Sequence, residues 1–161
     1  MSVTLFGVFL FSDPVKAINE LYRTTKPGGT CIATVWSELG HRPAAKGIIK
    51  RVRGENGKFD KPLEIGWKEM EDPALFIKFF ERAGFKNCRY ELRPSPLVWA
   101  GDDAVDDASE MLGSLYRNFI TFKDADEEVR YDEAWKEELR GSVVDGKLTF
   151  HMLATIAFGE K

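Results

Sequence analysis

The feature that most constrains the fold is a helix-like segment set between two apolar runs. The run Val3 to Phe11 is apolar almost without alternation, and a second apolar run covers residues 30–36. Such continuous runs are typical of strands that are covered on both faces of a parallel sheet. Between them, Asp13 can cap a helix that Pro14 opens and that should extend to about Thr25. The sequence therefore predicts a strand, a helix and a strand in this order.

The turn that follows this helix is Lys26-Pro27-Gly28-Gly29. Pro27 cannot continue a helix without losing a hydrogen bond, and the two glycines allow the positive backbone angles that turn the chain back. A strand, helix and strand joined in this way imply a right-handed crossover and two parallel neighbours. We therefore expect a βαβ unit in an α/β fold.

The rest of the chain gives further helices and strands of the same kind. Asp72 should cap a helix that closes at Gly84, and a polar loop should lead to Trp67 before it. No repeat or linker marks a boundary, so we expect one domain over residues 1–161. The other predicted helices cover residues 38–53, 103–121 and 124–140, and the predicted strands at 87–98 and 147–159 should pair with each other.

The composition argues against several classes of partner. The formal net charge of −3 provides no basic surface, so neither a nucleic acid nor a membrane is an expected partner. No apolar run approaches the roughly 20 residues of a spanning helix, and the N-terminal run lacks a basic leader, which favours a cytoplasmic protein. Cys31 and Cys88 lie in apolar strand-like runs and should be buried reduced thiols.

These segments together resemble a known family. The stretch "LFGVFLFSDPVKAINELYRTTKPGGTCIATVW", followed by "FFERAGF" and "ATIAFGEK", looks like the C-terminal half of a class I S-adenosylmethionine-dependent methyltransferase. It is similar in particular to the small-molecule methyltransferase-like proteins of fungal secondary metabolism. Their helix and turn pattern is matched here by Asp13, Pro14, Lys16, Ala17, Glu20, Tyr22, Arg23, Lys26, Pro27, Gly28 and Gly29.

The resemblance implies a partial Rossmann-like sheet with two parallel strands, a C-terminal antiparallel pair, helices on both faces and a helical insertion over residues 98–146. In that family the cofactor lies on a glycine-rich turn after the first strand, and an acidic residue after the second strand holds the ribose. By resemblance, Met1 begins just before the fourth of seven strands, and the chain contains no G-x-G motif. We therefore expect no cofactor for this chain alone, and S-adenosylmethionine if a missing half completes it.

Three functions remain open at this point. The first is a methyltransferase-derived protein that binds or rearranges a small natural product without S-adenosylmethionine, as a cyclase or isomerase would. The second is a true small-molecule methyltransferase, present as a partial chain or completed by a partner. The third is a structural or interaction domain without catalysis. No serine-histidine-acid pattern, zinc spacing or phosphate loop supports another enzyme class.

Candidate site residues follow from the fold. Ligands of open α/β sheets bind beyond the carboxyl ends of the strands, so Phe11, Asp13 and Trp36 are expected to contact a substrate. His41 can exchange a proton near neutral pH, and Glu38 could share its helical face, which makes the two a candidate catalytic pair.

The insertion supplies a second group of candidates. By resemblance it forms the substrate lid, whose apolar wall would include Trp99, Met111, Leu112, Tyr116 and Phe119. The acidic cluster at residues 102–107 complements a helix dipole, and no His or Cys joins it, so no metal site is expected.

The first predicted strand is also a candidate surface for association with another protein chain. Val3 to Phe11 would lie at a sheet edge, and the segment carries no lysine or proline to deter pairing with another chain. We expect a homodimer through this edge, with Phe6, Val8 and Phe9 near its twofold axis. Pairing with a different subunit, or an N-terminal segment that folds back, are the alternatives.

Overall fold

The computed structural model describes residues 1–63 and 68–161, and its internal contacts divide the chain into two compact units. Unit 1 contains the described residues of 1–39, 68–95 and 152–161, and unit 2 contains residues 40–63 and 96–151. The predicted loop reaches Trp67, which lies outside the described residues. The single domain over residues 1–161 stays a prediction.

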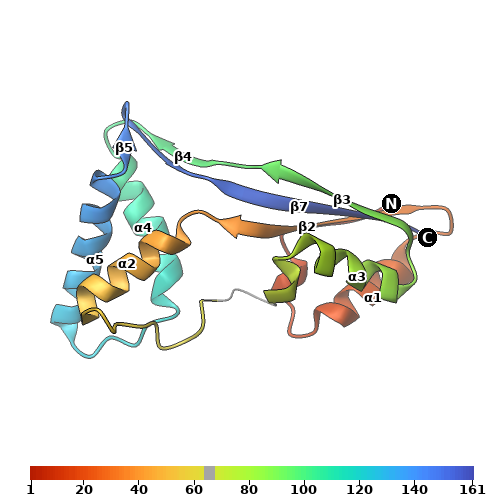
Figure 1. The fold of residues 1–161 in the computed structure, drawn as a ribbon, viewed down its shortest axis with the longest axis horizontal. Coiled ribbons are helices and arrows are strands. Elements are labelled where there is room, and N and C mark those ends of the chain that lie inside the picture. Colours follow the sequence, from red (N-terminus) through yellow and green to blue (C-terminus); the bar gives the residue numbers. More distant parts are fainter. Residues whose placement is uncertain (64–67) are drawn as a thin grey trace. The chain divides into compact units, whose positions relative to one another are not determined.

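Unit 1 is built on a four-stranded mixed sheet with the strand order β1-β2-β7-β3. Strand β1 (Ser2–Leu5) is parallel to β2 (Thr30–Leu39), while β7 (Met152–Glu160) lies antiparallel between β2 and β3 (Lys86–Pro94) (Figure 1). The predicted α/β fold, with a parallel pair and a C-terminal antiparallel pair, is confirmed.

The α-helices of this unit begin and end at the capping residues that the sequence indicates. In α1 (Pro14–Thr24) the Asp13 carboxylate accepts the N–H of Lys16 at 3.0 Å. In α3 (Pro73–Ala83) Asp72 accepts two backbone N–H groups in the same way, and Gly84 ends the helix at a φ of 102°. Both predicted caps are therefore confirmed.

Both helices cover the same face of the sheet. Ile18 of α1 and Phe76 of α3 pack in one buried cluster with Cys31, Ala33 and Val35, which point to one side of β2. The opposite side of β2 carries residues such as Ile32, which is only half-buried. Figure 1 shows α1 and α3 on one side of the sheet, whereas the sequence predicted helices on both faces.

The first predicted strand is shorter than expected. Strand β1 ends at Leu5, and Val8–Leu10 form the short 3-10 helix η1 instead of continuing it. At Phe6 the backbone takes a φ of 49° and its N–H bonds to the Thr34 carbonyl at 3.1 Å. The prediction of a strand over all of Val3 to Phe11 is thus wrong, because the chain turns at Phe6 and Val8 packs in the core from η1.

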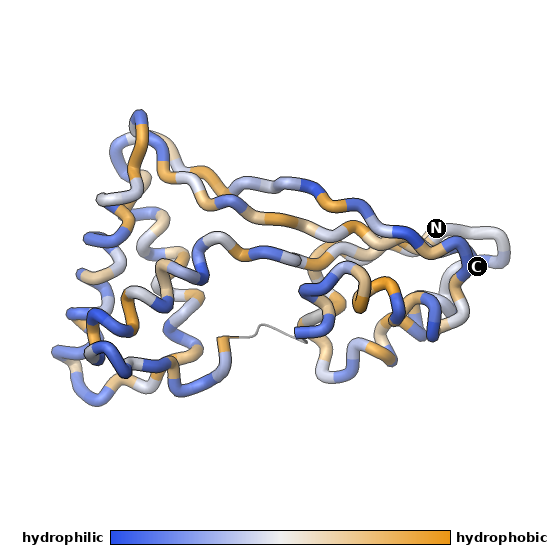
Figure 2. The backbone as a smooth tube through the Cα atoms, in the orientation of Figure 1, coloured by the Kyte–Doolittle hydropathy of each residue, from blue (hydrophilic) through white to orange (hydrophobic). Residues whose placement is uncertain are grey.

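Unit 2 combines a small antiparallel sheet with three helices. The sheet has the order β4-β6-β5, formed by Leu97–Ala100, Lys147–Phe150 and Val143–Val144. The helices are α2 (Arg42–Arg53), α4 (Ala104–Arg117) and α5 (Ala125–Arg140). Hydrophobic and hydrophilic residues alternate along α4 and α5 (Figure 2), and the buried apolar ones form one core with Trp135.

Three predicted boundaries are corrected. The strand predicted at 87–98 is two strands, β3 and β4, separated at Ser95 and Pro96, and Pro96 has no N–H for a ladder. The strand predicted at 147–159 is likewise interrupted at His151. The helix predicted from residue 38 begins only at Arg42, since β2 extends to Leu39.

A second 3-10 helix, η2, covers Lys68–Met70.

Candidate functional site

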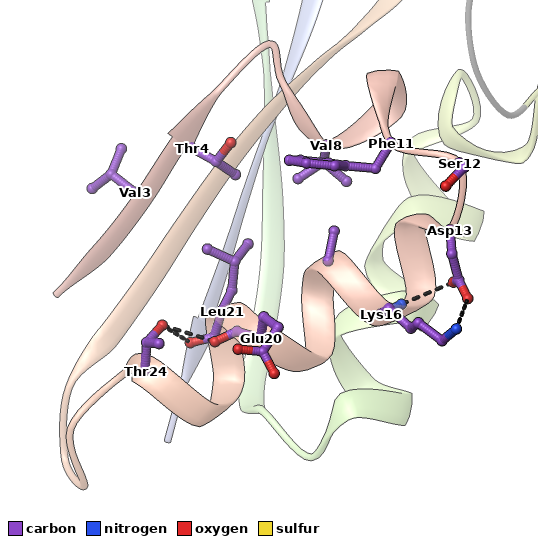
Figure 3. Close-up of a pocket in the computed structure, with 11 residues that line it drawn as sticks. Val3, Thr4, Val8, Phe11, Ser12, Asp13, Lys16, Glu20, Leu21 and Thr24 are labelled. Atoms are coloured by element: carbon purple, nitrogen blue, oxygen red, sulfur yellow. Dashed lines mark hydrogen bonds and ion pairs between the residues drawn. The ribbon is translucent and has the colours of Figure 1, made fainter.

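A groove lies between β1 and α1 in unit 1. Its volume is about 590 Å³, which is within the range of small-molecule sites. One wall is the outer edge strand of the sheet and the other is a face of α1 (Figure 3). The lining residues are Val3, Thr4, Val8, Phe11, Ser12, Asp13, Lys16, Ala17, Glu20, Leu21 and Thr24.

The turn after β1 shapes the apolar part of this groove. Because the chain leaves the sheet at Phe6, η1 places Val8 above the N-terminal half of α1, and the Phe11 ring lies beside it (Figure 3). Val8 is 1% exposed and packs against the core that contains Ile18, whereas Phe11 is 57% exposed. The buried valine fixes the wall, and the phenylalanine ring offers a free aromatic surface to a ligand.

Polar groups lie at the ends of the groove. Lys16 Nζ is 3.4 Å from a carboxylate oxygen of Asp13, and the backbone N–H of Lys16 lowers the pKa of that carboxyl group. At the other end the Thr24 hydroxyl donates to the Glu20 carbonyl at 2.8 Å. The groove therefore presents apolar walls with an ion pair at one end, an arrangement suited to an apolar molecule with a polar end group.

The sequence-predicted residues of unit 1 fall in different places. Phe11 and Asp13 line the groove, whereas Trp36 is not among its lining residues. The Trp36 indole stacks on the Phe6 ring with centroids 4.2 Å apart. Glu38 is an exposed residue of β2, beyond a bulge in the strand. Their roles as substrate-binding or catalytic residues stay predictions.

His41 occupies an unexpected environment in unit 2. Its side chain is only 3% exposed, and its Nδ1 lies 2.7 Å from the Tyr116 hydroxyl. Burial, with a smaller contribution from the Arg42 charge, lowers the pKa of His41 to about 4. The predicted sharing of one helical face by Glu38 and His41 is wrong, because Glu38 lies in β2 and His41 directly precedes α2.

This environment does not favour acid-base chemistry at His41. The imidazole is neutral at physiological pH and one ring nitrogen already bonds to a buried hydroxyl. Burial also raises the pKa of the Tyr116 hydroxyl. The pair satisfies two buried polar groups, and the catalytic role of His41 stays a prediction.

The predicted lid residues are mostly core residues of unit 2. Leu112 and Tyr116 are buried, and Trp99 and Phe119 pack against the same cluster. The Tyr116 ring stacks on Trp135 with centroids 5.6 Å apart. Met111 alone among the five is largely exposed, at 46%. Core packing accounts for the four clustered side chains, and their contact with a substrate stays a prediction.

The predictions about metal binding, membrane-spanning helices and the two cysteines can be compared with the structure. Within residues 1–63 and 68–161, His, Cys, Asp and Glu side chains form no group that could hold a metal ion. In the same part of the chain, each helix is too short or too polar to cross a membrane. Cys31 and Cys88 are free thiols, and burial raises the pKa of Cys31 to about 11.

Sequence reasoning missed the α1 wall of the groove. Lys16, Ala17 and Glu20 were part of the family pattern, yet they were not expected to face a ligand. The available signal was the helical spacing from Asp13 to Ala17, Glu20 and Thr24, which places these residues on one side of α1. Only the path of the chain after Leu5 shows that this side borders a groove.

This chain is similar to solved protein structures, but no similar sequence is found among protein families or curated proteins. No protein-family model matches it, and no curated protein sequence matches it. A provisionally assigned methyltransferase of Bacillus halodurans matches 99% of the chain with a TM-score of 0.46 and 18% identity. The YcgJ protein of Bacillus subtilis matches 100% with a TM-score of 0.45 and 15% identity.

A third structure is a Haemonchus contortus phosphoethanolamine N-methyltransferase in complex with phosphomonomethylethanolamine and S-adenosylhomocysteine. It matches 99% of the chain with a TM-score of 0.40 and 14% identity. The chain spans 62%, 64% and 32% of the lengths of the Bacillus halodurans, Bacillus subtilis and Haemonchus contortus proteins, respectively.

Proposed function

We propose that this protein binds a small, predominantly apolar organic molecule in the groove between β1 and α1, on a methyltransferase-related scaffold and without S-adenosylmethionine of its own. The single observation that carries the proposal is the groove itself, about 590 Å³ in volume, with an exposed aromatic ring on one wall and an ion pair at one end. The methyltransferase relation rests on the sequence resemblance around the Lys26-Pro27-Gly28-Gly29 turn. The parallel β1–β2 pair and the antiparallel β3–β7 pair agree with what that resemblance implies.

The character of the walls defines the ligand class. Val3 and Leu21 present aliphatic surface, and Phe11 can stack on a flat ring. Asp13 and Lys16 can orient a hydroxyl or carbonyl group at the end of such a molecule. A flat compound with few polar substituents, of the kind found among aromatic natural products, fits this description.

Rearrangement of the bound molecule is the finer part of the proposal. A cyclisation or isomerisation would need a group that moves a proton, and the ionisable side chains that line the groove are Asp13, Lys16 and Glu20. Each is engaged in an exposed ion pair, Asp13 with Lys16 and Glu20 with Arg23. Binding is therefore better supported than catalysis.

A fluorescent ligand tests the binding proposal directly. N-phenyl-1-naphthylamine is neutral, flat and apolar, and its titration should saturate in the micromolar range, about −7 to −8 kcal/mol. Ala17→Phe should fill the groove and weaken this binding at least tenfold. Asn19→Phe places the same ring on an exposed position of α1 outside the groove and should leave binding unchanged.

Two results would contradict the proposal. Equal binding by the wild type and both variants would mean that the probe binds elsewhere. No saturable binding by the wild type would favour the third function, a structural or interaction domain.

A second candidate is S-adenosylmethionine-dependent methyl transfer, with the cofactor site completed by a partner. What supports it is the resemblance of the helix and turn over residues 13–29 to class I methyltransferases, whose cofactor-binding strands a partner would have to supply. Calorimetric titration of this chain with S-adenosylmethionine separates the candidates. We expect at most millimolar affinity, and a Kd near or below 10 μM, about −7 kcal/mol, would make the second candidate the better one.

A further inference from the structure

The two edges of the unit 1 sheet differ in how they resist pairing with another chain. The outer strand β3 carries Arg89, Glu91 and Arg93, which form exposed ion pairs, and ends in Pro94. Charged side chains and proline on an edge strand deter addition of a further strand. The opposite edge, β1, belongs to the segment Met1–Ser12, which contains no charged side chain and no proline.

The backbone of β1 has hydrogen-bonding groups that point away from the sheet. β1 and β2 are parallel with Thr4 in register with Ala33, and the Phe6 N–H bonds to the Thr34 carbonyl. The backbone N–H and C=O groups of successive residues alternate in direction along a strand. Those of Thr4 therefore point toward β2, as the N–H of Phe6 does. The N–H and C=O groups of Val3 and Leu5 therefore point outward from the free edge.

These outward groups are self-complementary. A twofold axis beside Thr4 sets Val3 of one copy opposite Leu5 of a second copy in an antiparallel ladder. Both residues of such a pair exchange N–H to C=O bonds, so the two symmetric pairs use all four outward N–H groups. The same register brings Val3 and Leu5 side chains together, which are 46% and 67% exposed in the single chain.

We propose that a second copy of this chain adds to the β1 edge through an antiparallel β1–β1 ladder centred on Thr4. The segment has no charged side chains, so no like-charged side chains oppose each other there, and the pairing buries apolar side chains that are otherwise in water. Leu10 and Phe11, which follow the strand along the chain, are also more than half exposed.

The axis differs from the one expected from sequence. Val8 lies in η1 with 1% exposure and packs in the core, so it cannot take part in a ladder. Phe6 stacks on Trp36, and the side chain of Phe9 lies outside the described part of the chain. The axis therefore moves to Thr4. Since Val3 and Thr4 also line the groove, the added strand forms a further wall of that groove.

A cysteine at the axis tests the register. In the proposed ladder the two Thr4 residues form a non-hydrogen-bonded pair with Cα atoms about 4.5 Å apart, within the range of a disulfide. Thr4→Cys, in a Cys88→Ser background, should give a covalent dimer on mild oxidation of the chain without an N-terminal tag. Val98→Cys in the same background, exposed on β4 of unit 2, measures random collisional crosslinking.

Sedimentation velocity from 1 to 50 μM tests the dimer itself. The wild type should be dimeric at the upper concentration and Leu5→Lys monomeric, with unchanged circular dichroism. Leu92→Lys makes the same change at an exposed position of β3 and should remain dimeric.

Three outcomes would overturn the proposal. They are a monomeric wild type at 50 μM, equal dimerisation of Leu5→Lys and Leu92→Lys, and crosslinking of Thr4→Cys no faster than that of Val98→Cys. If Leu5→Lys does not fold, the crosslinking comparison decides. No ligand is used, so a negative result here is distinct from failure of the groove to bind a probe.

Discussion

At the scale of single residues, the buried imidazole of His41 makes stability depend on pH. Its pKa is about 4 in the folded chain against an ordinary value of 6.5, so the unfolded chain binds the proton first as the pH falls. The free energy of unfolding contributed by His41 is complete above about pH 6.5 and is lost toward pH 4. Between pH 7.5 and 5.0 this loss should be about 2 kcal/mol, measured by urea unfolding. His41→Gln should remove this part of the pH dependence, while His151→Gln, at an exposed position, should keep it. Identical pH dependence in the wild type and His41→Gln would contradict the assignment.

At the scale of secondary-structure elements, two arginines of α2 make ion pairs with α5 that differ in burial. Arg53 donates to Glu127 at 2.7 Å, and the two side chains are 10% and 2% exposed, whereas the pair of Arg51 with Glu138 lies at the surface. Arg53→Met leaves the buried Glu127 carboxylate without its cation and also removes the Arg53 bonds to Asp60 and to the Lys58 and Thr121 carbonyls, so it should lower the free energy of unfolding by about 3 kcal/mol. Arg51→Met removes a solvated pair and should cost less than about 1 kcal/mol. Chemical denaturation of both variants at pH 7.5 gives the comparison, and equal costs would show that burial of Glu127 is not what distinguishes the pairs.

At the scale of the whole molecule, hydrogen exchange should report both the sheet order and the proposed assembly. Amides of β7 should exchange most slowly in unit 1, because β7 bonds to β2 on one side and β3 on the other. Amides of Val3 and Leu5 point outward, so their protection should rise at least tenfold between 1 and 50 μM protein if the β1 ladder forms. Amides of β4 in unit 2 serve as the reference and should not respond to concentration. Concentration-independent exchange at Val3 and Leu5 would speak against a dimer through this edge.

The sequence by itself determined those features that depend on nearby residues. Asp13 and Asp72 cap their helices because a carboxylate three residues before a free N–H needs no other part of the chain. Gly28 has a φ of 73°, as the turn before β2 requires, and the parallel β1–β2 pair follows from that short crossover. Phe11 and Asp13 could be proposed for the site because they follow the first strand along the chain.

Only the tertiary structure decided where apolar and polar side chains are buried. The run from Val3 to Phe11 is uniformly apolar, and such a run cannot show that Phe6 stacks on Trp36 and ends the strand. Likewise, the sequence alone does not show that His41, which precedes a helix, is buried. Its ring nitrogen contacts the hydroxyl of Tyr116, which is 75 positions away in the sequence. The α1 wall of the groove was missed for the same reason. Burial, and with it pKa and access to a ligand, is set by contacts between residues that are distant in sequence, whereas caps and turns are set by contacts within a few residues.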